Sequence, residues 1–365
     1  MIEKNYDEVF LTSLTGPLYY SSEIGKKVKR IMKSDNGLML REKFPQYIPW
    51  CSAFPSGLVI LSDGSVSTCC FDPFGRNSLG NVFESDLLSI WKKNVRQVVK
   101  KGLYSLDGCR DCIGNESLSS LISDPEDYLV WENSVQGYPT DITIEIMGAC
   151  NYGCCVSPEV QKYRNTKLDL YELFPRIKSF LHGIKRIRLF NYGEPLLNEG
   201  FCDFIENCRK ETSEVKMILA TNGILMNERI STSLIERKVD TVVVSVHGGP
   251  GTENMLKYSR YGADYEKVLQ NVKRLIELKK EFNSEYPKIS LRAILFNWND
   301  KDDIMDKFRE DAMALGLRAT GGNPDTDNYQ WLLDGASGRL ERASKRFLAG
   351  NVETEKLIKN GELMV

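Results

Sequence analysis

The sequence has no excess of charge of either sign, and this absence excludes several classes of partner. Lysine and arginine number 48 against 50 aspartates and glutamates among 365 residues, so the formal net charge is −2 at pH 7. A chain without a positive excess has no overall field that attracts nucleic acid or an anionic membrane. We therefore expect neither as a partner, since binding of that kind would need a local basic patch.

Long apolar runs and a signal peptide are also missing. The longest apolar runs, such as Val242–Val246, are far shorter than the roughly 20 residues that cross a bilayer as a helix. The N-terminal stretch MIEKNYDEVF lacks the basic and apolar regions of a signal peptide. We therefore expect a cytoplasmic, globular protein that is long enough for two domains.

The ten cysteines are too few for a disulfide scaffold of this size, and most of them are clustered. Short spacings of this kind indicate metal binding in a reducing compartment. We therefore predict metal ligands and no disulfides. Cys202 and Cys208 stand apart in a helical stretch, where we expect buried packing residues. The clustered cysteines are Cys51, Cys69, Cys70, Cys109, Cys112, Cys150, Cys154 and Cys155.

The chain changes character near residue 140. Before it, short strand-like and turn-like pieces crowd the cysteines, and GLVILSDGSVSTCC predicts a hairpin with an Asp-Gly turn. After it, apolar strands alternate with amphipathic helices, which predicts a parallel sheet with crossover helices, either a (β/α) barrel or a doubly wound sheet. Active residues of both folds collect at the carboxyl ends of the strands. The expected strands are 141–147, 186–190, 215–220, 241–246 and 289–296, and the expected helices are 168–181, 200–210, 227–238, 264–282 and 301–316.

The segment directly after the first of these strands, GACNYGCCVSP, carries the most informative cysteines. Cys150 and Cys154 are separated by three residues, which resembles the cluster loop of the radical S-adenosylmethionine (AdoMet) family, in which three residues and then two separate three cysteines. The resemblance implies an α/β fold of the partial (β/α)6 TIM-barrel type. It also implies a 4Fe-4S cluster held by three thiolates, with one open iron that AdoMet chelates.

The loop departs from the family pattern at its third position, which is Ser157. A serine oxygen is a much harder ligand than a thiolate, and thiolates are the rule at iron-sulfur sites. Three explanations stay open. Cys155 supplies the third thiolate through a shortened loop, the serine was introduced to disable cleavage, or the chain is a naturally divergent or inactive family member.

The other strand ends carry further family-like segments. Asn191-Tyr192-Gly193-Glu194-Pro195 resembles the Gly-Gly-Glu-Pro segment whose backbone carbonyls bind the AdoMet amine, and glycine allows that close approach. Ser245 is placed for the ribose or carboxylate, and Arg292 for the carboxylate, which a guanidinium binds with paired hydrogen bonds. The AdoMet-binding residues that the resemblance implies are Tyr152, Asn191, Tyr192, Gly193, Glu194, Thr221, Asn222, Ser245, His247 and Arg292. Glu145 is a further cavity candidate, and we assign no catalytic acid or base.

The cysteines before residue 140 resemble an auxiliary iron-sulfur module of the SPASM or Twitch type. Twelve residues separate Cys51 from Gly64 and four separate Gly64 from Cys69, and GNVFESDLLSIW is similar to the segment that such modules carry between cysteine pairs. The resemblance implies a second 4Fe-4S cluster held by Cys51, Cys69, Cys109 and Cys112. Spacing favours Cys69 over Cys70 by one residue, and a structural zinc site is the alternative.

These patterns together predict a domain organisation and a function. We expect an N-terminal extension at 1–49, the SPASM/Twitch-like module at 50–115, a linker at 116–139, the radical AdoMet barrel at 140–322 and a C-terminal extension at 323–365. The resemblance implies an oxidoreductase that reductively cleaves AdoMet to a 5′-deoxyadenosyl radical and abstracts hydrogen from a peptide or a sugar-like substrate. The electron donor would be a flavodoxin or a ferredoxin. The alternative is an inactive AdoMet- or peptide-binding protein of the same fold.

Overall fold

A computed structural model of the chain separates into two compact units, Met1–Val59 with Ser65–Asp141, and Ile60–Gly64 with Ile142–Val365. We describe each unit by itself. The change of unit at Asp141 falls where the sequence changes character. The residues that the structure describes are 49–50, 57–70, 72, 74–92, 120–121, 139–153, 165–320, 325–333, 346 and 352–364.

The first unit is built of short elements. Between its two stretches the chain turns at Asp63-Gly64, within the segment Ile60–Gly64 that belongs to the second unit. The sequence predicts this turn, in which Gly64 adopts φ +84° and its N–H donates to the Leu61 carbonyl at 2.8 Å. Strand β1 pairs antiparallel with β5, β2 is next to β3, and β3 pairs antiparallel with β4. The elements are β1 (Pro49–Trp50), β2 (Gly57–Ile60), β3 (Ser65–Ser67), β4 (Gly80–Asn81), α6 (Leu87–Ile90) and β5 (Ser120–Leu121).

The second unit is a sheet in which strands follow one another in chain order from β6 to β12. The pairs from β7 to β12 are all parallel, which confirms the predicted parallel sheet with crossover helices. This is the mixed α/β sheet of a partial barrel. The strands are β6 (Asp141–Ile144), β7 (Arg186–Arg188), β8 (Lys216–Thr221), β9 (Thr241–Ser245), β10 (Lys288–Ile294), β11 (Asn328–Leu332) and β12 (Leu363–Met364).

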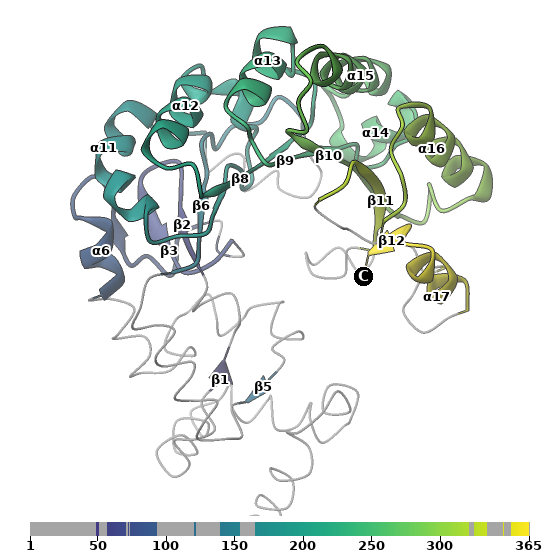
Figure 1. Ribbon diagram of the computed structural model, residues 1–365. Coiled ribbons are helices and arrows are strands. Elements are labelled where there is room, and N and C mark those ends of the chain that lie inside the picture. Colours follow the sequence, from purple (N-terminus) through teal and green to yellow (C-terminus); the bar gives the residue numbers. More distant parts are fainter. Residues whose placement is uncertain are drawn as a thin grey trace, which may run out of the picture. The chain divides into compact units, whose positions relative to one another are not determined.

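Helices of this unit lie along the outer, convex side of the curved sheet (Figure 1). They begin at polar caps and bury a stripe of apolar residues: in α15, Asp264 accepts from the Lys267 N–H at 2.9 Å, and Val268, Val272 and Leu275 are fully buried. The helices are α11 (Leu170–Leu181), η4 (Pro195–Leu197), α12 (Phe201–Glu211), α13 (Glu228–Glu236), α14 (Thr252–Ser259), α15 (Tyr265–Glu281), α16 (Asp302–Ala314) and α17 (Val352–Lys359). No helix among the described residues is both long enough and apolar enough to span a membrane.

The pairing register of the strands shows which side chains face the inner side of the sheet. On β11, the rings of Tyr329 and Trp331 pack on Phe308 of α16, with centroids 5.9 and 4.6 Å apart, so these residues face the helices. Successive strand residues point to opposite faces. Gln330 therefore faces inward, together with its register partner Arg292 on β10 and with Ser245 on β9, which pairs with Arg292.

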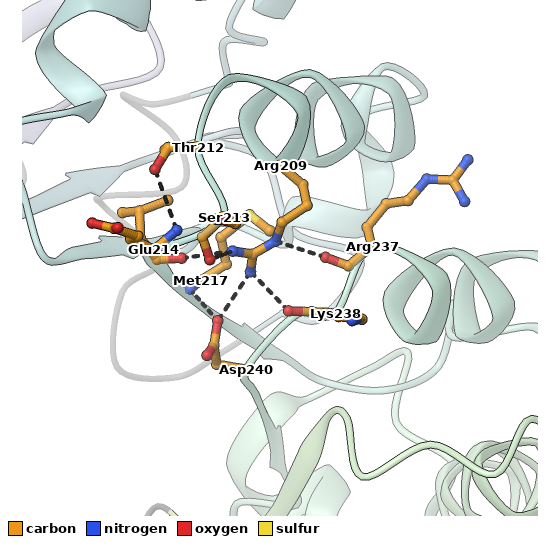
Figure 2. A network of polar contacts seen from close by, with 9 residues as sticks. Arg209, Thr212, Ser213, Glu214, Met217, Arg237, Lys238 and Asp240 are labelled. Atoms are coloured by element: carbon orange, nitrogen blue, oxygen red, sulfur yellow. Dashed lines mark hydrogen bonds and ion pairs between the residues drawn. The ribbon is translucent and has the colours of Figure 1, made fainter.

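The amino ends of β8 and β9 are tied together by one arginine (Figure 2). Arg209, near the end of α12, directs its guanidinium into the turns that lead into these strands. The carboxylate of Asp240 accepts from Arg209 at 3.1 Å and from the Met217 N–H at 2.9 Å. The other acceptors of Arg209 are the carbonyls of Ser213, Val215, Arg237 and Lys238, at 2.8 to 3.0 Å.

Two parts of the second unit differ from the expectation. Helix α14 is not predicted, because its eight residues stand between glycine-rich turns and offer too short a pattern. The sheet also continues beyond residue 322, since β11 and β12 come from the segment expected as a C-terminal extension. The inner face of β11 thus contributes residues that we did not include in the site.

Candidate functional site

The predicted cluster loop begins directly after β6, and the structure describes it as far as Gly153. Cys150 is half-buried, and its Sγ accepts the Tyr152 backbone N–H at 3.4 Å. Backbone N–H groups that point at a sulfur are a usual feature of iron-sulfur ligands. The surroundings of Cys150 therefore suit its predicted role as a cluster ligand, and it is the predicted ligand of this loop that the structure describes. Cys154, Cys155 and Ser157 lie outside the described residues, so the choice among them stays a prediction.

The segment after β7 packs directly on the backbone of this loop. A Cβ on Gly193 would stand 1.9 Å from the Met147 carbonyl oxygen and 2.7 Å from that of Ala149, so only glycine fits. The next residue secures the contact, because the Glu194 N–H donates to the Ala149 carbonyl at 2.8 Å. The glycine of the Gly-Glu-Pro segment is thus the point where the ends of β6 and β7 meet.

The Glu194 side chain turns toward β8. Its carboxylate accepts from the Thr221 hydroxyl at 2.7 Å, from the Asn222 N–H at 2.8 Å and from the Leu196 N–H at 3.1 Å. Burial raises the pKa of this carboxyl to about 7, although the three donors favour the ionised form. The side chains of Glu194 and Thr221 are therefore bonded to each other. Either residue would contact AdoMet through its backbone groups.

Asn222 connects β8 to the cluster loop. Its side-chain Nδ2 donates to the Asn151 Oδ1 at 2.7 Å and lies 3.9 Å from the Cys150 Sγ. The Glu194 carboxylate fixes the Asn222 backbone from the other side. Sequence reasoning selects Asn222 and misses Asn151, whose partner is 71 residues away. Asparagine is common in turns, so Asn151 in the cysteine loop does not by itself indicate a hydrogen bond to a distant strand.

Asn191 and Tyr192 are placed by a buried acid. The Glu145 Oε1 accepts from the Asn191 Nδ2 at 3.2 Å and from the Tyr192 N–H at 3.4 Å. The Glu145 Oε2 accepts from the N–H and the hydroxyl of Ser62 at 3.0 and 2.8 Å. Glu145 thus has neutral donors on both oxygens. Ser62 is a second residue that the sequence does not predict.

The far side of the cluster loop is held by the turn after α14. A Cβ on Gly262, which adopts φ +80°, would stand 2.2 Å from the Asn151 carbonyl oxygen. A Cβ on Gly153 would meet the Tyr261 ring at the same distance. Tyr152, between them, is 4% exposed. The predicted AdoMet-binding residue Tyr152 is therefore packed inside the loop.

Ser245, His247 and Arg292 stand at the ends of β9 and β10. Ser245 and Arg292 are register partners, and the Arg292 Nε donates to the Ser290 hydroxyl at 3.0 Å. Burial lowers the pKa of the Arg292 guanidinium, and within the described residues no carboxylate pairs with it. The His247 ring packs edge-on against Tyr258, with centroids 5.3 Å apart. Arg292 is therefore a half-buried cation that an anionic ligand group would neutralise.

In the first unit, the described cysteines of the predicted auxiliary site are Cys69 and Cys70. The Cys69 carbonyl accepts the Asp72 N–H at 3.2 Å, and the Asp72 carboxylate accepts from the Ser67 hydroxyl and the Asn77 N–H. Cys69 is half-buried in this braced turn and Cys70 is exposed. No group of three metal-binding side chains is present in the described part of the chain. Cys51, Cys109 and Cys112 lie outside it, so this ligand set stays a prediction.

The two cysteines set apart from the clusters pack in α12. Cys208 is fully buried, and burial raises the pKa of its thiol to about 12, which makes it inert at neutral pH. Cys202 is half-buried.

Comparison with known proteins identifies two segments. Residues 144–308 match the Radical SAM superfamily, and residues 30–113 match the SPASM iron-sulfur cluster-binding domain. The chain therefore belongs to the radical SAM superfamily and carries a SPASM domain on the N-terminal side of its radical SAM domain. The predicted family and its unusual domain order are both confirmed.

Individual relatives share the family at modest identity. The GTP 3′,8-cyclase of Clostridium perfringens is 28% identical over 45% of this chain and 49% of its own length. An uncharacterised protein of Methanocaldococcus jannaschii is 30% identical over 57% and 71%. The AdoMet-dependent 2-deoxy-scyllo-inosamine dehydrogenase of Niallia circulans is 30% identical over 35% and 53%. The chain thus spans about half the length of the first and third of these relatives.

The described residues fit the groups that this family implies. The tight contact of Gly193 with the Met147 and Ala149 carbonyls leaves room for no side chain and holds the segment after β7 on the cluster loop. Arg292 offers a half-buried positive charge for a carboxylate, and Cys150 offers a partly exposed thiol at the convergence of three strand ends. The family thus implies AdoMet and a 4Fe-4S cluster at this rim, and auxiliary iron-sulfur chemistry in the SPASM domain.

Proposed function

We propose that this chain is a radical SAM oxidoreductase that reductively cleaves AdoMet and abstracts hydrogen from a peptide or a sugar-like substrate. The observation that carries the proposal is the convergence of β6, β7 and β8 on Cys150, through Gly193 on the Ala149 carbonyl and Asn222 on Asn151. A rim built around one thiol, and an arginine on β10 that no described carboxylate pairs with, suit a cluster and an anionic cosubstrate.

The ligand sets follow the sequence prediction. Cys150 and Cys154 would hold the radical cluster, with Cys155 or Ser157 in the third position. Cys51, Cys69, Cys109 and Cys112 would hold the auxiliary cluster, for which zinc is the alternative. When bound and reduced by a flavodoxin or ferredoxin, the radical cluster and AdoMet supply a 5′-deoxyadenosyl radical. These chemistries fit the reducing conditions of the cytoplasm, where we place the protein.

The residues of the rim would bind and orient AdoMet. Backbone carbonyls near Gly193 would bind its amine, and the Arg292 guanidinium would bind its carboxylate with paired hydrogen bonds. Ser245 and His247 line the neighbouring strand end. Glu194 and Glu145 would act as positioning residues, because each holds backbone N–H groups of the rim and neither reaches out of it.

A second candidate function is an AdoMet- or peptide-binding protein that has lost cleavage. The departure at Ser157 favours it, because a serine ligand leaves the ligand set one thiolate short. The two candidates share the same fold and differ in the radical cluster alone.

Anaerobic reconstitution followed by iron and sulfide counting and a chromatographic assay for 5′-deoxyadenosine separates the candidates. The enzyme proposal expects two clusters and 5′-deoxyadenosine from the chain as it stands, and Cys155→Ala then identifies whether Cys155 is the third ligand. One cluster and no product, with product regained in Ser157→Cys, supports the disabled protein. Zinc at the N-terminal cysteines would refute the auxiliary cluster while leaving the radical site untouched.

A further inference from the structure

Gln330, in the middle of β11, has a carboxamide without a hydrogen-bond partner among the described residues. The residue is 0% exposed, and within that part of the chain neither its Nε2 nor its Oε1 makes a hydrogen bond. Leaving a buried polar group unpaired destabilises a fold, and native proteins pair most such groups. Because Tyr329 and Trp331 face α16, this carboxamide points to the inner side of the barrel sheet, away from the helices.

The neighbour of Gln330 on the inner face is Arg292, its register partner on the adjoining strand. Adjoining strands lie about 4.8 Å apart. Arg292 is anchored from below, because its Nε donates to the Ser290 hydroxyl, which donates to the Asn328 Oδ1 at 2.7 Å. A ligand group on Gln330 would therefore stand directly beside the group that Arg292 binds.

The next level of the inner face, toward the carboxyl ends of the strands, is apolar. Ile294 and Leu332 are register partners one level beyond Arg292 and Gln330. Ile294 packs with Phe296 and Tyr258, and Leu332 and Trp298 pack against that cluster. The carboxamide of Gln330, with its donor Nε2 and its acceptor Oε1, thus lies next to an apolar wall that Ile294 and Leu332 form.

We propose that Gln330 binds the main chain of an extended peptide substrate, donating to the carbonyl and accepting from the N–H of one residue. In an extended chain those two groups point to the same side, as in the residue pairs of antiparallel strands that exchange both hydrogen bonds. The inference rests on the proposed function, because it assigns the charge of Arg292 to AdoMet and leaves Gln330 to the substrate.

A peptide suits this place better than a sugar-like molecule. A peptide residue offers one N–H, one carbonyl and a side chain that the wall of Ile294 and Leu332 can cover. A polyol carries hydroxyls in several directions, and each would need a partner where the wall offers none. Since no atom of Gln330 is exposed, the side chains over it must shift when the peptide enters.

The test uses N-acetyl-leucine N-methylamide, which has one residue with both main-chain groups and an apolar side chain, and myo-inositol as the polyol. Saturation-transfer NMR measures binding of each probe to the reconstituted protein, with and without AdoMet. We expect the peptide probe to bind and myo-inositol not to bind. Gln330→Met, which keeps the volume and removes both polar atoms, should weaken the peptide probe by tenfold or more, as loss of about 1.4 kcal/mol implies.

Two further measurements separate this inference from the proposed function. Equilibrium dialysis with AdoMet should give the same affinity for Gln330→Met as for the wild type, and thermal unfolding should show a variant at least as stable. A failure of AdoMet binding in the wild type counts against the proposed function alone. Peptide binding that is absent, or that Gln330→Met leaves unchanged, overturns the inference, as does myo-inositol binding that the variant abolishes.

Discussion

Two arginines of the radical SAM domain, Arg209 and Arg292, show how the two ends of its sheet differ. Arg209 stands at the amino ends of the strands and makes hydrogen bonds to four carbonyls and to Asp240. Arg292 stands near the carboxyl ends, and within the described part of the chain its side chain makes one hydrogen bond, from Nε to the Ser290 hydroxyl. The guanidinium of Arg209 is thus bonded to the protein itself, while most donors of the Arg292 guanidinium are left for a ligand.

Glu194 lies between these extremes. It lies near the carboxyl ends like Arg292 but is buried, both of its oxygens accept hydrogen bonds, and all the donors are neutral. The three side chains differ in how far the protein itself satisfies their hydrogen bonds, which decreases from Arg209 through Glu194 to Arg292. Arg209 therefore stabilises the fold, while Arg292 is available to a ligand. Substitutions should therefore change stability at one end of the sheet and binding at the other.

The largest effect is expected from Arg209→Met. It removes the charged partner of Asp240, which keeps the Met217 N–H, and the donor to four carbonyls, so the free energy of unfolding should fall by about 3 to 5 kcal/mol. Denaturant unfolding measures this. The control is Arg176→Met on α11, where an exposed pair with Glu172 is lost and less than about 0.5 kcal/mol is expected. If Arg209→Met lost as little stability as Arg176→Met, Arg209 would not be a residue that stabilises the fold.

A pH-dependent effect is expected at Glu194. Its pKa rises from 4.5 to about 7 on folding, so the folded chain keeps a proton that the unfolded chain releases. The resulting stabilisation is complete below pH 4.5 and is lost as the pH rises toward 7, by about 3 kcal/mol at most. Measured from pH 4.5 to 8, the free energy of unfolding of the wild type should fall relative to that of Glu194→Gln until about pH 7 and should then stay constant relative to it. A constant difference throughout would mean that the carboxyl is ionised in the fold.

Arg292→Met should show the opposite signature to Arg209→Met. Removing a half-buried charge that no described carboxylate neutralises should leave the free energy of unfolding unchanged or higher. The affinity for AdoMet should fall about 10- to 100-fold, because a charged hydrogen bond contributes about 1.5 to 3 kcal/mol. Calorimetry with decarboxylated AdoMet is the ligand control, since the variant and the wild type should bind it equally. Equal losses for both ligands would assign Arg292 to another group.

The sequence predicts the strand ends well, because their signals are local. Gly193 and Asn222 follow apolar strands directly, and the parallel sheet then brings them to one rim. It does not predict which side chains meet there. The bond from Asn222 to Asn151 joins residues far apart in the chain. Gln330 lies on a strand, NYQWL, whose polar and aromatic residues alternate as in a strand, but nothing in that pattern shows that its carboxamide lacks a partner in the fold. Arg209 carries no motif at all, since its partners are mostly backbone carbonyls.

The smallest effect concerns Asn222, whose Nδ2 lies 3.9 Å from the Cys150 Sγ. Hydrogen bonds to cluster sulfurs raise the reduction potential, because they stabilise the added electron. Asn222→Leu should therefore make the potential of the radical cluster more negative, by a small amount that matches the long contact. An electron paramagnetic resonance titration of the reconstituted protein measures it, in the Ser157→Cys background if the natural loop holds no cluster.

Asn271→Leu is the matched control for this last substitution. Asn271 is a buried asparagine whose Nδ2 donates to the Gly223 and Ile224 carbonyls, so it supports the same turn without reaching the cysteine loop. Its loss should leave the potential unchanged. If both variants shift the potential equally, the effect comes from the packing of the turn. A shift in Asn222→Leu alone would show that a side chain at the carboxyl end of β8 influences the reduction potential of the cluster. Arg209 and Asp240, whose polar atoms are bonded to the fold at the amino ends of the strands, cannot have this effect.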